Sequence, residues 1–336
     1  LRGSRDGFVE TLVSNAALLR RRIRDPKFSM ELYGVGRRSR SDVVICYISD
    51  SVDKSVLKRM RKLIQSIDVD ALTMNIESLA ECMFTHKWIN PFPKFKYSER
   101  PDTATAAILD GNIVIMVDNS PAVMIIPASI FDIIEEADDF NFSPIIGSYL
   151  RITRFFFSIV TWILTPLWLL FVNNPDWVPE FLKFILITDD ITVPVLLQLL
   201  ILELAVDGLK LAAVNTPTML STPLSIVAGI VVGEYAVSSG WFNPEALLYM
   251  AVVTVGTYGQ TNFEMGYAFK FLRVLMLILT QIFNLAGFIT GVVISVLMIA
   301  FNRTITGKSY IYPLIPWDGK MLKRKVFRVR LPHGFK

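Results

Sequence analysis

Three charged residues stand in line within an otherwise apolar segment. Residues 200–210 are LILELAVDGLK, in which Glu203, Asp207 and Lys210 are spaced by four and then three residues. On a helix these spacings place all three side chains on one face. The pattern fits an amphipathic helix lying on a bilayer, a self-neutralising Asp207–Lys210 pair, or the lining of a polar pathway. We expect the helix to lie along the membrane with its acidic face toward water or a neighbouring subunit.

Two further carboxylates each end an uncharged stretch. Glu234 follows the uncharged run 211–233, and Glu264 follows the run 246–263. In a ring of identical subunits either residue would become a ring of carboxylates, which concentrates cations and repels anions. The alternative interpretation is a carboxylate in water at the membrane boundary.

The run 246–263 is unusually polar for an uncharged segment. It carries Thr254, Thr257, Gln260 and Asn262 together with two glycines. Such a segment suits a water-facing or tightly packed helix better than a lipid-facing one, and the sequence leaves those two alternatives open. In the last uncharged run, Thr280, Asn284 and Gly291 share a helical face, which indicates a packing seam.

Residues for covalent or metal chemistry are sparse. The two histidines, His86 and His333, lie outside the apolar runs, and Cys46 and Cys82 lack the spacing of a metal site. We interpret the cysteines as reduced structural thiols. No nucleophile elbow, phosphate-binding loop or zinc pair is present in the sequence. We therefore predict a protein that is not an enzyme and that has no cofactor and no metal site.

The elements that would position these residues differ along the chain. Apolar residues make up 52% and charged residues 19%, with a mean hydropathy of +0.47, whereas soluble domains average about 25% charged residues. The apolar excess lies between about 152 and 301. There, four uncharged runs are each long enough to cross roughly 30 Å of hydrocarbon; they cover 155–172, 211–233, 246–263 and 274–301. We predict four spanning helices plus one amphipathic helix at 191–210.

Basic residues set the predicted orientation. Arg151 and Arg154 precede the first run, and six lysines and arginines lie between 320 and 330. The positive-inside rule places both ends in the cytoplasm, although Lys270 and Arg273 then fall outside, against the rule. The predicted divisions are a cytoplasmic domain at 1–145, a transmembrane domain at 146–305 and a basic cytoplasmic tail at 306–336. Because the chain begins at Leu1 without a charged-then-apolar leader, we expect a fragment of a longer protein without a cleavable signal.

The first 150 residues have the patterning of a soluble α/β domain. Helical periodicity predicts helices at 6–24, 51–66 and 74–83, and β-branched runs predict strands at 42–49 and 67–73. Turn signals at Asp110-Gly111-Asn112 and Asn119-Ser120-Pro121 divide residues 106–128 into a predicted three-stranded meander. Strands alternating with helices and followed by a meander indicate an α/β fold. We interpret the basic clusters of the chain as contacts with anionic lipid, not nucleic acid.

Three separate blocks resemble the A-type subunits of spore germinant receptors, the GerA family. The blocks are RGSRDGFVETLVSNAALLRRRIRD at 2–25, SERPDTATAAILDGNIVIMVDNSPAVMIIPA at 98–128 and LLILELAVDGLKLAAVNTP at 199–217. They occur in the family's order and extend the resemblance over essentially the whole chain. In the segment TPTMLSTPLSIVAGIVVGEYAV at 216–237, Met219, Leu220, Ser221 and Glu234 depart from the typical receptor pattern. The departure favours a paralogous branch of the same family over a nutrient receptor.

The resemblance implies a location and a function. It implies an integral protein of the spore inner membrane, assembled as a homo-oligomer that passes monovalent cations during germination. The expected partners are membrane lipid and possible further germination membrane proteins, with no nucleic acid. The alternatives are a non-conducting docking subunit of a germination complex and, ranked last, a membrane enzyme or secondary transporter.

Overall fold

The computed structural model describes residues 4–83, 90–190, 192–215 and 234–329. The chain forms two compact units, one made of Leu1–Ile152 with Met298–Lys336 and the other of Thr153–Leu297. The predicted divisions at 1–145, 146–305 and 306–336 follow the change in composition along the chain and remain predictions. Each unit is described separately.

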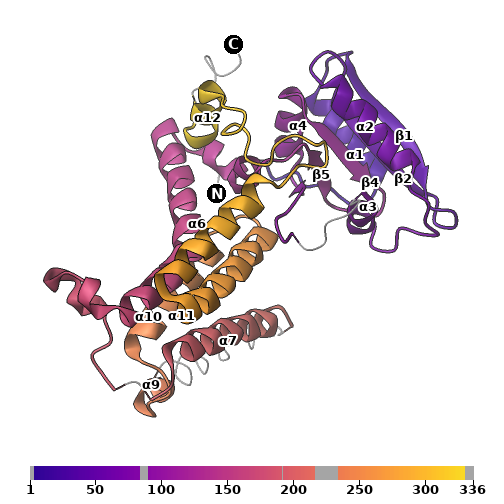
Figure 1. Ribbon diagram of the computed structural model, residues 1–336. Coiled ribbons are helices and arrows are strands. Elements are labelled where there is room, and N and C mark those ends of the chain that lie inside the picture. Colours follow the sequence, from indigo (N-terminus) through magenta and orange to yellow (C-terminus); the bar gives the residue numbers. More distant parts are fainter. Residues whose placement is uncertain (1–3, 84–89, 191, 216–233, 330–336) are drawn as a thin grey trace. The chain divides into compact units, whose positions relative to one another are not determined.

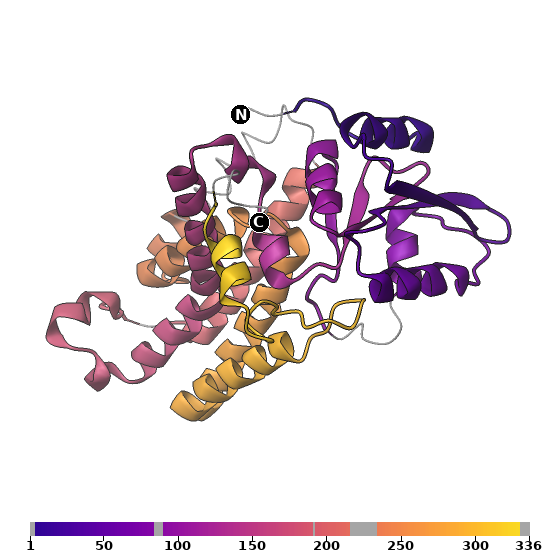
Figure 2. The ribbon, with the colours of Figure 1, turned by 90° about the horizontal axis from the view of Figure 1, so that it is seen from above.

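The first unit is built on a five-stranded antiparallel sheet (Figures 1 and 2). In spatial order its strands are β1 (Phe28–Val35), β2 (Ser41–Ile48), β4 (Ile113–Val117), β5 (Val123–Ile126) and β3 (Lys96–Ser98). Every residue of β4 and β5 is buried. Such continuous apolar strands are expected where both faces of a sheet are covered.

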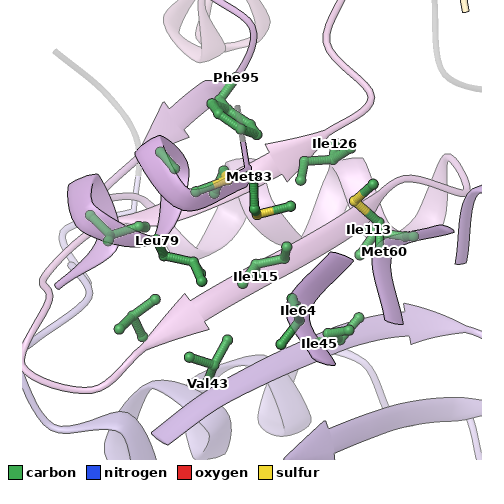
Figure 3. Close-up of a cluster of buried hydrophobic side chains, with 14 of the residues drawn as sticks. Val43, Ile45, Met60, Ile64, Leu79, Met83, Phe95, Ile113, Ile115 and Ile126 are labelled. Carbon is green, nitrogen blue, oxygen red and sulfur yellow. The ribbon is translucent and has the colours of Figure 1, made fainter. Parts of the chain in front are cut away.

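Helices cover both faces of this sheet. On one face, α2 (Lys54–Gln65) and α3 (Ile76–Met83) pack over Ile45 and Ile115 (Figure 3). On the other face, α1 (Leu12–Arg22) and α4 (Pro101–Leu109) pack over Cys46 and Val114. The two clusters use alternate residues of the same strands, as the two-residue period of a strand requires. The predicted α/β class of the N-terminal part is confirmed, with an antiparallel sheet.

Several predicted elements of this unit were wrong. The segment 67–73 is a loop whose Val69 and Asp70 carbonyls accept hydrogen bonds from the backbone N–H groups of Arg37 and Arg38. The first predicted strand of the meander, which begins at 106, is instead the C-terminal part of helix α4. This helix starts at Pro101, and proline is suited to the first turn of a helix. Strands β1 and β3 were not predicted.

A buried ionic network joins the C-terminal helix α12 (Gly319–Val326) to the linker before the first long apolar helix. The guanidinium of Arg151 is 2% exposed and bonds to Glu135 at 2.6 Å and Asp139 at 3.1 Å. It also donates to the carbonyl oxygens of Arg324 and Lys325, at 3.1 and 3.4 Å. The described residues of the basic tail, up to 329, therefore pack within this unit.

The ammonium of Lys325 completes the network. It lies 2.5 Å from Asp132 and 3.2 Å from Glu135. Burial alone would lower the pKa of Lys325, but the two carboxylates reverse this effect and raise it. Burial likewise opposes ionisation of Asp132, and Lys325 overcomes it and holds the pKa of that carboxyl below its usual value. Lys325 and Asp132 thus hold one another ionised.

The second unit is helical. Its described α-helices are α6 (Pro144–Asn173), α7 (Val195–Asn215), α9 (Ala236–Ser238), α10 (Pro244–Tyr258) and α11 (Phe263–Ala300). Helix α6 begins in the first unit, and α11 ends in it. Two short 3-10 helices, η2 (Pro175–Trp177) and η3 (Glu180–Ile185), lie between α6 and α7. Among the described residues, α6 and α11 are long and apolar enough to cross a membrane. The helical membrane part is supported, but four spanning helices are not confirmed. The run 211–233 falls mostly outside the described residues, and α10 has only 15 residues where about 20 are needed.

Helix α11 contains a reversal of direction at Asn284, whose φ of 53° and ψ of −130° are not helical. A Cβ placed on Gly291 would lie 2.6 Å from Met276 Cγ, although residues 15 apart in a straight helix are separated by about 22 Å. A Cβ placed on Gly287 would likewise clash with the backbone carbonyl of Leu279. The segments 263–283 and 285–300 therefore run side by side as a hairpin (Figure 1). The single crossing expected over 274–301 is interrupted.

The predicted seam in this region is partly confirmed by the hairpin. Thr280 and Gly291 are buried between packed helices, as expected. Asn284 instead lies exposed in the turn, where its amide exchanges hydrogen bonds of 2.6 and 2.9 Å with the amide of Asn174. Asparagine is one of the few residues that tolerate a positive φ.

The reversal can be tested by distance measurement. Spin labels on Phe271→Cys and Val296→Cys, both at exposed positions, would be about 38 Å apart along a continuous helix. In the hairpin, helix axes roughly 8–10 Å apart predict a label separation below about 20 Å. Double electron–electron resonance on the purified full-length protein distinguishes the two, and a distance near 38 Å would exclude the hairpin.

Candidate functional site

The charged stripe of α7 faces the 263–283 segment of α11. The Glu203 carboxylate is buried, and its Oε1 accepts a hydrogen bond from Arg273 Nε at 2.5 Å. Lys270 Nζ lies 3.4 Å from Glu203 Oε2 and also pairs with Asp207. Two carboxylates spaced by four residues on one helix thus meet two cations spaced by three residues on another.

Burial explains why these four charges occur together. An ionised group removed from water is costly unless it is paired and hydrogen-bonded, and Arg273 is only 3% exposed. The Arg273 guanidinium also donates to the carbonyl oxygen of Thr161 on α6. The pairing therefore joins α6, α7 and α11. It also supplies the counter-charges of Lys270 and Arg273, the two cations that the positive-inside rule left unexplained.

Lys210 does not make the Asp207–Lys210 pair that was one of the predicted alternatives. Asp207 pairs with Lys270 of another helix. The Lys210 ammonium lies 5.3 Å from the ring centroid of Tyr258 and 5.4 Å from that of Tyr267. Both distances are within the range of a cation–π interaction.

These side chains line a cavity of about 100 Å³. Of the nine candidate residues selected from the sequence, the structure brings together six in its lining: Glu203, Asp207, Lys210, Thr254, Thr257 and Gln260. The hydroxyls of Thr254 and Thr257 donate to the carbonyls one turn earlier, at 2.7 and 2.8 Å. The walls of the cavity thus combine charged groups with hydroxyl and amide groups.

Two acceptors in the lining have no partner among the described residues. Gln260 donates through Nε2 to Thr161 Oγ1 at 3.1 Å, but its Oε1 is buried without a hydrogen bond. The Oδ1 atom of the Asp207 carboxylate is also buried without a hydrogen bond. Buried acceptors normally have a partner, so these two oxygens are suited to a water molecule or a small cation.

The other three candidate residues lie outside the cavity lining. Asn262 accepts the backbone N–H of Met265 at 3.0 Å and so caps the start of α11. Glu264 is exposed in the first turn of α11, and Glu234 is exposed next to residues outside the described part of the chain. Their assignment to an ion pathway or a subunit contact remains a prediction, as it does for the other six.

The sequence analysis missed several residues of this site. Lys270 and Arg273 were noted only as exceptions to the positive-inside rule, and Thr161, Tyr258 and Tyr267 were not considered as partners. The usable signal was the three-residue spacing of two cations within an apolar helix, which matches the spacing of the carboxylates on α7. The arrangement of these side chains supports polar and electrostatic contacts. No group of metal-ligating side chains occurs among the described residues.

Comparisons with known proteins agree on one family. Residues 1–335 match the family model described as Bacillus/Clostridium GerA spore germination protein. The chain is 38% identical to stage V sporulation protein AF of Bacillus subtilis strain 168, over 99% of this chain and 67% of that protein. It is 28% identical to spore germination protein GerLA of Bacillus cereus, over 98% and 67%. The chain thus spans about two thirds of the length of these relatives.

A solved structure also matches part of the chain. It is the crystal structure of the N-terminal domain of the A subunit of the Bacillus megaterium spore germinant receptor GerK3. The match has 32% identity and a TM-score of 0.29, and it covers 36% of this chain and 94% of that one.

The buried pairing predicts a double-mutant pattern. Glu203→Gln should lower the free energy of unfolding by about 3 kcal/mol, because it leaves Arg273 buried without a counter-charge. The double variant Glu203→Gln/Arg273→Met should recover at least half of this loss. Unfolding of the full-length protein in mixed detergent micelles measures both.

The matched control for this pair is Glu180→Gln. Its side chain is 91% exposed and pairs with Lys183 at the surface, so the unfolding midpoint should not change measurably. Equal destabilisation by Glu203→Gln and by the double variant would show that Glu203 and Arg273 are not coupled.

Proposed function

The chain belongs to the GerA family of Bacillus/Clostridium spore germination proteins, and on that premise we propose that it is a channel subunit of a germination complex. In this proposal the subunits form a homo-oligomer in the spore inner membrane. Their helical units together conduct monovalent cations during germination. The N- and C-terminal parts face the cytoplasm.

The observation that carries the proposal is the cavity with two acceptors that have no partner in the described part of the chain. Monovalent cations are coordinated by oxygen atoms that replace their hydration shell. Asp207 Oδ1 and Gln260 Oε1 are such oxygens, and they lie in the lining of a cavity within the helical unit. Polar groups inside a membrane helix bundle are costly, so they are a default indication of a pathway.

The charge balance of the lining refines this proposal. Lys210, Lys270 and Arg273 accompany Glu203 and Asp207 in the lining, so the cavity alone does not attract cations through an excess of negative charge. Any cation preference must come from oxygen coordination at the cavity, or from carboxylate rings elsewhere. Glu234 and Glu264, both exposed, are our proposed rings.

An exposed glycine supports assembly into an oligomer. A Cβ placed on Gly208 of α7 would meet no atom of the described residues within 4 Å, so these residues leave the position open on the helix surface next to Asp207. Small residues allow a neighbouring helix to approach closely in a membrane. We propose that Gly208 marks a contact with the next subunit.

A second candidate function is a non-conducting docking subunit of a germination membrane complex. The ion pairs of Glu203 and Asp207 favour it, because a network that joins three helices is sufficient to explain these charges as structural. A docking role does not account for the unpartnered oxygens of Asp207 and Gln260. For this reason we rank it second.

Ion flux in liposomes tests the channel proposal without breaking the ion pairs. We expect Thr257→Val and Gln260→Met in the full-length protein to change cation flux by roughly tenfold, because hydrogen bonds to charged groups contribute about 1.5–3 kcal/mol. Thr290→Val is the matched control, since the Thr290 hydroxyl makes the same one-turn bond, to Ala286, at an exposed position.

Three outcomes can be told apart. Altered flux in the cavity variants with an unchanged control supports conduction along the cavity. Unchanged flux in all variants places the pathway elsewhere. If assembled protein of every variant, including the wild type, passes no ions, the docking function is favoured.

A further inference from the structure

The outer face of α2 carries four cations that form no ion pair with the described part of the chain. Lys54, Lys58, Arg59 and Lys62 are all exposed, and the helix KSVLKRMRKLIQ contains no acidic residue. The opposite face is buried against the sheet through Val56, Leu57, Met60 and Ile64. The four basic residues therefore point away from the protein core, and we call them the α2 basic face.

Nearby carboxylates are already engaged. Glu31 is bound by Arg61, and hydrogen bonding to Arg61 is the main cause that lowers its pKa to about 2. Asp53, the N-cap of α2, pairs with Lys308 at 2.7 Å. Among the residues that the structure describes, no ion pair is formed by the α2 basic face.

The arginines of α1, in the same unit, form ion pairs and hydrogen bonds within the protein. Arg21 and Arg22 both pair with Asp6, at 2.5 and 3.2 Å. Arg20 donates to the carbonyl of Phe28 at 2.9 Å and stacks over its ring. The α1 cluster is thus engaged within the protein through two ion pairs, whereas the α2 basic face makes only a hydrogen bond from Arg59 to a backbone carbonyl among the described residues.

The α2 basic face is also tied to the end of the last apolar helix. Arg59 Nη1 lies 3.4 Å from the carbonyl oxygen of Thr306, and Lys308 holds Asp53 at the start of α2. Thr306 follows Ala300, where α11 ends, by six residues, which reach at most about 21 Å. Because these residues belong to one compact unit, α2 lies within a short distance of the point where the chain would leave the membrane.

We propose that the α2 basic face binds the anionic phospholipid headgroups of the leaflet from which α11 emerges. Clustered lysines and arginines beside a membrane helix attract anionic lipid, and each residue contributes to the attraction. The phosphate groups would supply the counter-charges that the described residues do not provide at this face. The proposal rests on the chain spanning a membrane and not on ion conduction, so its test is independent of flux.

Lysine reactivity in lipid nanodiscs tests this binding. The full-length protein is placed in nanodiscs of phosphatidylcholine alone or of equal phosphatidylcholine and phosphatidylglycerol, and acylation by an amine reagent is followed by peptide mass spectrometry. At 0.1 M salt we expect Lys58 and Lys62 to react roughly fivefold more slowly in the anionic nanodiscs. At 1 M salt, where the screening length is about 3 Å, the two rates should converge.

Two controls complete the experiment. Lys27, which is exposed in the same unit and paired with Asp50, should react equally in both nanodiscs. In Lys58→Gln/Lys62→Gln, the protection of Lys54 by anionic lipid should largely disappear. Equal rates for Lys58 and Lys62 in the two nanodiscs at low salt would overturn the proposal. Protection that is independent of lipid charge would overturn it as well and would indicate a protein contact.

Discussion

The helical unit depends on one buried ion pair, between Glu203 and Arg273. Burying either charge alone in an apolar bundle would be costly, so each requires the other. Their pairing sets α7 against the 263–283 segment of α11 and brings Lys270 to Asp207. The bond from Arg273 to Thr161 adds α6. The cavity is lined by α7, α10 and the 263–283 segment of α11, and it contains two oxygens that have no partner among the described residues.

The α/β unit uses the same physical principle at the start of α6. Arg151 is buried there with Glu135 and Asp139, and Lys325 of α12 shares the network. Charges that stand next to apolar helices are thus satisfied by carboxylates distant in the sequence. The basic face of α2 differs from these networks, because its four cations form no ion pair among the described residues, and we assign it an external partner.

Short-range patterns in the sequence were sufficient for part of the fold. The strand over 42–49 and the helices over 51–66 and 74–83 are present within a few residues of the predicted bounds, because periodicity and capping are local. Strands β1 and β3 could not be found in this way, since each lies at an edge of the sheet and is only partly buried. The reversal at Asn284 had no glycine or proline to mark it.

Part of the candidate site could be predicted from the sequence. Spacing placed Glu203 and Asp207 on one face, and the polarity of 254–262 was evident without a structure. Their partners were not, because Lys270 lies 63 residues from Asp207 and Arg273 lies 70 residues from Glu203. Side-chain partners at such separations are set by tertiary packing and not by local pattern.

Several residues in the family's sequence blocks have structural roles in this chain. Asp118 accepts the N–H of Leu12 at 3.0 Å and so holds the start of α1. Gly111 has a φ of +88°, and a Cβ there would lie 2.8 Å from the Ser51 carbonyl oxygen. A turn so close to a backbone oxygen requires glycine. The first two blocks therefore have a structural role in the fold of the α/β unit, and the function has to be argued from the helical unit, which contains the third block.

Our central claim is that the cavity beside the Glu203–Arg273 pair is accessible to water and ions in the assembled protein. The most direct measurement is the reactivity of Thr257→Cys toward a small charged thiol reagent, in full-length protein otherwise free of cysteine and reconstituted in liposomes. We predict modification at a rate well above that of a cysteine at Leu277, which is buried in the apolar core. If both cysteines were equally unreactive, the cavity would be sealed and the account of it as an ion pathway would be wrong.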